Sequence, residues 1–226
     1  MKKEARYKSL IAHFSAHHPH PKTELHHNSP YELLVAVILS AQCTDKRVNK
    51  TTPTLFARFP NPYSLANAST EEVFTHIRSI SYPHNKARYL VGMAKQIVTH
   101  FGGNIPKNTT DLQSLIGIGR KSAHVIASAL YGKSVIAVDT HVTRVSKRLG
   151  LVSPRAKTPL AIEKELTKNL PPKYRADTHN WLVLHGRYIC TARKPKCNNC
   201  PLQTFCYYFQ KQVSIKKTHI TKNNTY

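Results

Sequence analysis

The chain has 226 residues, 40% of them hydrophobic and 20% charged, a balance that is typical of folded globular proteins and excludes an intrinsically disordered chain. Its 34 lysines and arginines outnumber 11 acids and leave a formal net charge of +23. A chain this basic favours a polyanionic partner, either a nucleic acid or an anionic membrane surface, over the alternative of a basic surface without a function.

Signals for a membrane or for secretion are lacking in the sequence. The longest wholly apolar run, Leu33 to Leu39, is far shorter than the roughly 20 residues that a spanning helix needs. The polar N-terminus has no apolar core or cleavage site of a signal peptide. We therefore expect an intracellular, cytoplasmic protein whose five cysteines are reduced.

Most of the chain has helical patterns. Residues 31–39 are apolar and predict a buried helix that runs into the polar end Ser40-Ala41-Gln42. Residues 69–72 (STEE) are typical of a helix start, because acids in the first turn complement the helix dipole. Residues 86–101 have helical periodicity that two glycines end. Residues 134–138 (SVIAV) predict a short strand, although no partner strand is evident.

A helix-hairpin-helix motif is predicted around Gly117-Ile118-Gly119. Thr110 or Asp111 is expected to cap a short first helix, and a second helix is expected from about Arg120 to Tyr131. Glycines allow close backbone approach, and the start of the second helix presents N–H groups to a phosphate. An ordinary helical turn is the alternative. A dinucleotide-binding motif would need glycine at Ser122, and a Walker loop would need glycine at Arg120.

Lys121 and Asp139 are the candidate catalytic residues. Lys121 opens the second hairpin helix beside Arg120, and a lysine attacks carbon only as the neutral amine, a form that neighbouring cations and partial desolvation favour. Its alternative role is a phosphate contact. Asp139 follows an apolar segment and precedes a helix expected over residues 140–149. An N-cap, a chemical role, or both fit this position.

Four cysteines near the C-terminus have the spacing C-x6-C-x2-C-x5-C: Cys190, Cys197, Cys200 and Cys206. Reduced thiols this close together on a loop-rich segment predict a four-thiolate metal site, which spacing alone leaves open between zinc and an iron–sulfur cluster. Three cations lie between the first two cysteines, and we expect them to contact phosphates: Arg193, Lys194 and Lys196. Cys43 lies apart and is interpreted as a small buried residue.

Four stretches of the sequence closely resemble the endonuclease III family of DNA glycosylases. They are residues 40–45 (SAQCTD), 115–123 (LIGIGRKSA), 138–141 (VDTH), and 185–187 (HGR) leading into the cysteines. Ile116 stands where the family usually has proline, and His124 where asparagine is frequent.

The resemblance implies an all-α fold of two helical domains with a DNA-binding cleft between them and a C-terminal [4Fe-4S] cluster loop. We expect a helical barrel over residues 22–132, with the helix-hairpin-helix motif at about 110–132. Residues 1–21 with 133–212 are expected to form the cluster domain, followed by a polar tail over 213–226.

The resemblance also implies the roles of individual residues. Lys121 is the expected nucleophile, Asp139 is its activating carboxylate, and the four cysteines hold the cluster, whose role is structural. Gln42 is expected to fill the gap left by an extruded base, with Tyr82 as the best match to the family's wedge residue. Further DNA contacts are expected from the hairpin and from the segment after Asp139: Gly117, Gly119, Arg120 and His141.

The implied activity is base excision repair of double-stranded DNA by a monomer. Oxidised pyrimidines are removed, and the strand is cut 3′ to the abasic site by β-elimination through a lysine Schiff base. Three other functions share part of this pattern. An adenine glycosylase usually lacks lysine at position 121 and has a further C-terminal domain. A non-catalytic iron–sulfur DNA-binding module has no need for Lys121 with Asp139, and an electron carrier explains neither the hairpin nor the charge.

Overall fold

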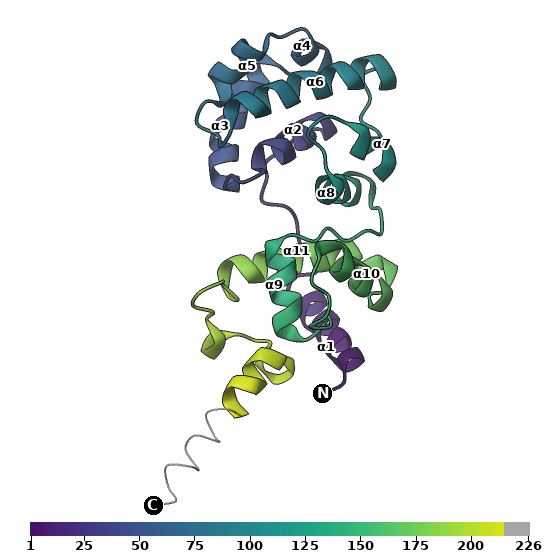
Figure 1. Ribbon diagram of the computed structural model, residues 1–226, viewed down its shortest axis with the longest axis vertical. Helices are drawn as coiled ribbons and strands as arrows, with labels where there is room; N and C mark the ends of the chain where they lie inside the picture. The colour runs from purple at the N-terminus through teal and green to yellow at the C-terminus, as the bar shows by residue number, and fades with distance from the viewer. Residues whose placement is uncertain (215–226) are drawn as a thin grey trace, which may run out of the picture. The chain divides into compact units, whose positions relative to one another are not determined.

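The computed structural model describes residues 1–214, and every regular element in this part of the chain is helical (Figure 1). The predicted all-α class is thus confirmed, and the predicted polar tail lies, from residue 215 on, outside the described residues. The chain folds as two compact units: a central unit, Thr23–Lys133, and a terminal unit, Met1–Lys22 with the chain from Ser134 onward. None of the described helices is long and apolar enough to span a membrane.

The central unit is built around one buried helix. It contains the following helices: α2 (Pro30–Ser40), α3 (Asp45–Arg58), α4 (Pro62–Ala66), α5 (Thr70–Ile77), α6 (Pro83–Phe101), α7 (Thr109–Ser114) and α8 (Arg120–Tyr131). Every residue of α2 from Leu33 to Leu39 is at most 3% exposed. A helix that is apolar on all sides must be covered on all sides, and α3, α6 and α8 contact it.

The terminal unit joins the first helix to the C-terminal half of the chain. It contains the following elements: α1 (Lys3–His17), α9 (Thr140–Leu149), α10 (Pro159–Asn169), η1 (Pro172–Tyr174), α11 (Arg175–Tyr188), η2 (Cys197–Asn199) and η3 (Gln203–Phe205). Phe14 of α1 stacks on Trp181 of α11 with ring centroids 5.4 Å apart, and the Tyr7 hydroxyl donates to the Leu151 carbonyl at 2.9 Å. These contacts, distant in sequence, fix α1 against the helices that lead to the cysteines.

Some of the predicted helix ends and caps are confirmed, and others are wrong. Ser69 caps α5, as expected, and Gly102 ends α6, which begins at Pro83 rather than Lys86. The predicted strand over residues 134–138 is wrong, because this segment forms no strand, although its last three residues are buried and Ile136 is 1% exposed. The cap of α7 is Asn108, whose side chain accepts from the Asp111 N–H, and not Thr110 or Asp111. Cys43 is half-buried.

Candidate active site and cluster site

The turn between α7 and α8 presents backbone to solvent. Gly117 has φ +84°, and a Cβ there would lie 3.0 Å from the Tyr89 Cβ, so this position requires glycine. Gly119 is the N-cap of α8 and has φ −88°, with open space where a Cβ would stand. Ile118 between them is 4% exposed and anchors the turn in the core. Because α8 has no side-chain cap at Gly119, its first turn offers backbone N–H groups to an anion.

Lys121 lies in the first turn of α8, directly after this turn, and is exposed together with Arg120. Lys121 therefore lies in the same first turn whose backbone N–H groups have no side-chain cap. The predicted partial desolvation of the Lys121 amine stays a prediction.

Gln42 and Tyr82 share an unusual backbone conformation. Among the described residues, they are the non-glycine residues with positive φ, at 53° and 56°. Gln42 follows the end of α2 and is exposed, and Tyr82 is the N-cap position of α6 and is 62% exposed. L-residues enter this region only when the surrounding structure requires it, and such residues cluster at functional sites.

Asp139 is the N-cap of α9, and its carboxylate accepts from the Val142 N–H at 2.8 Å. The predicted capping role is confirmed, and the side chain remains half-buried, not enclosed. His141, also half-buried, lies 3.1 Å from the Arg144 guanidinium through its Nδ1. Burial lowers the pKa of His141, which the nearby Asp139 carboxylate partly offsets.

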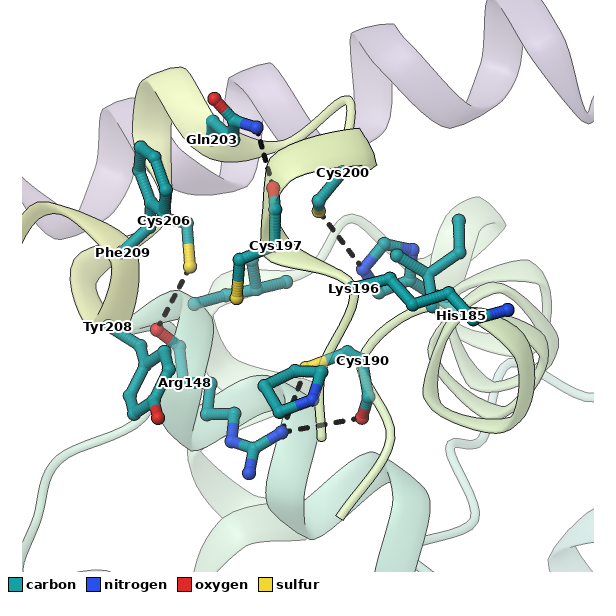
Figure 2. Close-up of a pocket in the computed structure, with 13 residues that line it drawn as sticks. Arg148, His185, Cys190, Lys196, Cys197, Cys200, Gln203, Cys206, Tyr208 and Phe209 are labelled. Atoms are coloured by element: carbon teal, nitrogen blue, oxygen red, sulfur yellow. Dashed lines mark hydrogen bonds between the residues drawn. The ribbon is translucent and has the colours of Figure 1, made fainter. Parts of the chain in front are cut away.

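The four cysteines of the predicted metal site line one pocket of the terminal unit (Figure 2). Cys190 follows the end of α11, Cys197 begins η2, Cys200 follows η2, and Cys206 follows η3. In Figure 2 their side chains are arranged around a common space. No three His, Cys, Asp or Glu side chains of residues 1–214 are close enough to hold a single metal ion, whereas all four thiols border the pocket.

The chemistry of this pocket suits an anionic, thiolate-bound group. Burial raises the pKa of Cys200 to about 11 and also raises the pKa of Cys197 and Cys206, which favours the protonated thiol at these three residues. Binding of a cluster would release these protons. Polar groups contact three of the sulfurs: the Arg148 guanidinium lies 3.4 Å from the Cys190 Sγ, the His185 Nε2 lies 3.6 Å from the Cys200 Sγ, and the Cys206 thiol donates to the Arg148 carbonyl at 3.5 Å.

The loop between the first two cysteines presents cations. Arg193, Lys194 and Lys196 are all exposed, as a phosphate-binding role requires. The Thr191 hydroxyl donates to the Lys194 carbonyl at 2.6 Å, and the Lys196 N–H donates to the Ile189 carbonyl at 2.9 Å. These internal bonds give the loop a defined shape.

Two arginines on one face of α9 hold this loop, and sequence reasoning missed both. Arg144 donates to the carbonyls of Cys190 and Gly186, at 3.0 and 2.8 Å. Arg148 donates to the carbonyls of Thr191 and Ala192, at 2.7 and 2.8 Å. The sequence alone indicates that these two arginines share one helix face, because they are four positions apart. Their partners, more than 40 residues later, had no local signal.

Two protein-family models match the chain. Residues 35–172 match the HhH-GPD superfamily of base excision DNA repair proteins. Residues 190–206, which contain all four cysteines, match the iron–sulfur binding domain of endonuclease III.

Curated and solved proteins agree with these matches. Endonuclease III of Haemophilus influenzae is 39% identical over 202 residues, covering 89% of this chain and 95% of that protein. Endonuclease III of Bacillus subtilis is 43% identical over 194 residues, covering 86% and 88%. A solved structure of a trapped endonuclease III–DNA covalent intermediate has a TM-score of 0.87 at 38% identity and covers 94% of this chain and all of that one.

Proposed function

The chain belongs to the endonuclease III family of helix-hairpin-helix base excision repair proteins, and from this membership we propose that it is a bifunctional DNA glycosylase and abasic-site lyase. It removes oxidised pyrimidines from double-stranded DNA and cuts the strand 3′ to the abasic site. The observation that carries the proposal is the exposed Lys121 in the first turn of α8, directly after the Gly117–Gly119 turn. A similar protein has been trapped in a covalent intermediate with DNA, as a lysine nucleophile requires.

The reaction starts with base flipping, because an atom inside a base-paired stack is out of reach of a side chain. The neutral Lys121 amine attacks C1′ of the flipped nucleotide as the bond between C1′ and the base breaks. Ring opening yields a Schiff base between the Lys121 nitrogen and C1′. Loss of a proton from C2′ then expels the 3′ phosphate, which cuts the strand by β-elimination.

Asp139 activates the amine in this proposal. Its carboxylate accepts the proton that Lys121 loses and stabilises the positive charge that develops on the sugar. Its capping bond to the Val142 N–H holds the carboxylate in one orientation, so both roles use the same side chain.

Backbone and cations bind the DNA. The N–H groups at Gly119 and the start of α8 take a phosphate, with Arg120 beside them. Arg193, Lys194 and Lys196 bind phosphates from the cluster loop, and His141 adds a contact near Asp139. Gln42 and Tyr82 enter the stack that the flipped nucleotide leaves. Affinity is therefore expected to fall steeply with salt, and a flat salt dependence contradicts this mode of binding.

Cys190, Cys197, Cys200 and Cys206 hold a [4Fe-4S] cluster, which matches the iron–sulfur domain found over residues 190–206. A cluster held by these four cysteines would cross-link the C-terminal loops, and we propose that its role is structural. Its loop then keeps its cations in place for phosphate binding. We also propose that the two units are the two domains of the fold, and that the protein acts as a monomer on DNA in the cytoplasm.

Borohydride trapping tests the proposal. The protein is incubated with duplex DNA that contains one oxidised pyrimidine, borohydride is added, and the covalent protein–DNA adduct is measured. We expect an adduct for the parent and for Lys95→Gln, which removes an exposed lysine of α6, and no adduct for Lys121→Gln.

Each result that differs from this expectation contradicts a different part of the proposal. Base removal by the parent without an adduct leaves a glycosylase that lacks lyase activity. Tight binding without base removal or strand cleavage, with the cluster present, leaves a non-catalytic DNA-binding module. An adduct that survives Lys121→Gln assigns the nucleophile to another amine.

A further inference from the structure

Lys86 is a buried lysine that the proposed mechanism does not use. Its residue is 4% exposed, and its Nζ donates to the carbonyls of Leu39 and Ala41, at 2.8 and 2.6 Å. Lysine is rarely buried to this extent, because desolvation of the ammonium is unfavourable unless the charge is well solvated by protein groups. Both acceptors are main-chain oxygens, so the ammonium binds the backbone around it.

The first of these backbone segments is the end of α2. The last carbonyls of a helix lack partners within the helix, and a glycine after the helix often resolves this. Here the residue after the C-cap is Gln42, and the Lys86 ammonium binds the carbonyls in place of a glycine-based cap. The Ala41 carbonyl belongs to the same peptide group as the Gln42 N–H. Its bond to Lys86 therefore holds the peptide plane that sets the φ of Gln42.

The second segment is the turn before α6. The Lys86 N–H donates to the Tyr82 carbonyl at 3.1 Å, which closes the first turn of α6 on the other residue with positive φ. One residue thus bonds to the peptide group before Gln42 and to the peptide group after Tyr82. Lys86 reaches the backbone next to Gln42 through its side-chain Nζ and the backbone next to Tyr82 through its own N–H, and it thereby links two residues that are 40 positions apart in sequence and are proposed to enter DNA.

We propose that Lys86 is a positioning residue that sets Gln42 and Tyr82, as a pair, in the conformations in which they enter the DNA stack. This inference rests on the proposed function. Because the side chains of Gln42 and Tyr82 are exposed, their directions depend on the backbone conformation of each residue. The bonds between Lys86 and the neighbouring main-chain carbonyls restrain that backbone. Prior ordering of both residues lowers the entropy lost when they replace the flipped nucleotide.

A comparison of two DNA substrates can distinguish a role of Lys86 in positioning from a role in stability. Duplex DNA with an oxidised pyrimidine requires insertion into the stack, whereas an abasic site in single-stranded DNA has no opposite strand and no stack to fill. The variant Lys86→Met keeps the aliphatic stem and removes the donors. We expect single-turnover base removal from the duplex to fall by about ten- to a hundred-fold, as misplacement of a positioning group does. Cleavage of the single-stranded abasic site should stay at the parent's rate.

A double-mutant cycle gives the second measurement. If Lys86 acts through the inserted pair, Lys86→Met should have almost no further effect on duplex base removal in a Gln42→Ala, Tyr82→Ala background. Lys95→Met, which removes an exposed lysine from the same helix, is the matched control and should behave like the parent. If Lys86→Met does not fold, Lys86→Gln carries the same comparison, because its amide can keep one of the carbonyl bonds.

The outcomes separate the inference from the proposed function. Equal losses on duplex and single-stranded substrates, or full additivity with the Gln42→Ala, Tyr82→Ala pair, overturn the positioning role of Lys86. If the parent itself forms no borohydride adduct with either DNA, the proposed function fails instead. Selective loss on the duplex, absent in the alanine background, supports the inference.

Discussion

The guanidinium of Arg148 lies 3.4 Å from the sulfur of Cys190, and the same side chain donates to the carbonyls of Thr191 and Ala192. Its guanidinium also lies over the Tyr208 ring, 5.1 Å from the centroid. One arginine of α9 therefore contacts the first cysteine, the loop after it and an aromatic residue beyond the last cysteine. Groups that hydrogen-bond to ligands of a metal site orient those ligands and tune their basicity.

Arg148→Ala should weaken retention of the cluster. The variant loses the bond near the Cys190 sulfur and the bonds that hold the loop, and changes of this kind lower affinity at metal sites by about 10- to 100-fold. Iron content per protein after treatment with a chelator, followed with the visible absorbance, measures the effect. Arg155→Ala, at an exposed position before α10, is the control. Equal iron loss from both variants contradicts the assigned role.

Asp139→Asn should separate capping from chemistry. Asparagine is as good an N-cap as aspartate, so the thermal midpoint should barely change, whereas Asp139→Ala should cost about 1 kcal/mol of stability. Both substitutions remove the carboxylate and should slow base removal by about 10²- to 10⁴-fold. Thermal unfolding and single-turnover kinetics on the same preparations decide this. Activity of Asp139→Asn at the parent's level would confine Asp139 to capping.

Alanine at the two hairpin glycines should have opposite consequences. Gly119→Ala has open space and φ −88°, so stability should hold, but the new methyl group faces the phosphate proposed at the α8 N-terminus. DNA affinity should therefore fall. Gly117→Ala forces a Cβ at φ +84° to 3.0 Å from Tyr89, and stability should fall by more than about 1 kcal/mol. Binding isotherms and denaturation curves test the pair, and unchanged affinity of Gly119→Ala excludes close phosphate approach there.

Glu165 should make the terminal unit sensitive to acid. Burial by itself raises the pKa of Glu165, but the hydrogen bonds from Lys3 and from the Ser153 N–H, with the Lys3 charge, lower it below its ordinary value of 4.5 overall. A depressed carboxyl pKa stabilises the fold above the unfolded pKa, and this contribution is lost as pH falls through the folded pKa.

Glu165→Gln should therefore reduce stability at neutral pH by about 1 kcal/mol or less and should flatten the loss of stability below about pH 4.5. Urea unfolding at a series of pH values measures this, with Glu71→Gln at an exposed position of α5 as the control. A variant whose pH profile parallels the parent's shows that the Lys3–Glu165 pair contributes no pH dependence.

Several features could be predicted because their causes are local. The uninterrupted apolar run of Leu33 to Leu39 requires burial on every side, and α2 is buried on every side. Gly102 and Gly150 end α6 and α9 in left-handed conformations, and Asp139 caps the start of α9, as the residue types alone indicate. The close spacing of four thiols predicted a shared pocket, and all four line one.

Other features depended on partners far along the chain. The β-branched segment 134–138 has strand propensity but finds no strand to pair with, and the Ala137 carbonyl instead accepts from the His179 ring at 2.9 Å. Pro53, whose residue type predicts a helix boundary, lies inside α3.

The sequence by itself determined the helical class, the hairpin turn, the cap at Asp139 and the set of four thiols, because residue type and short spacing govern each of them. Only the tertiary structure decided that Lys86 is buried against the end of α2 and that Arg148 meets the cysteine loop. A lysine or an arginine has the same local pattern whether it faces water or a carbonyl, and the carbonyls in question lie more than 40 positions away. Burial and hydrogen-bond partners at that separation exist only after the chain has folded.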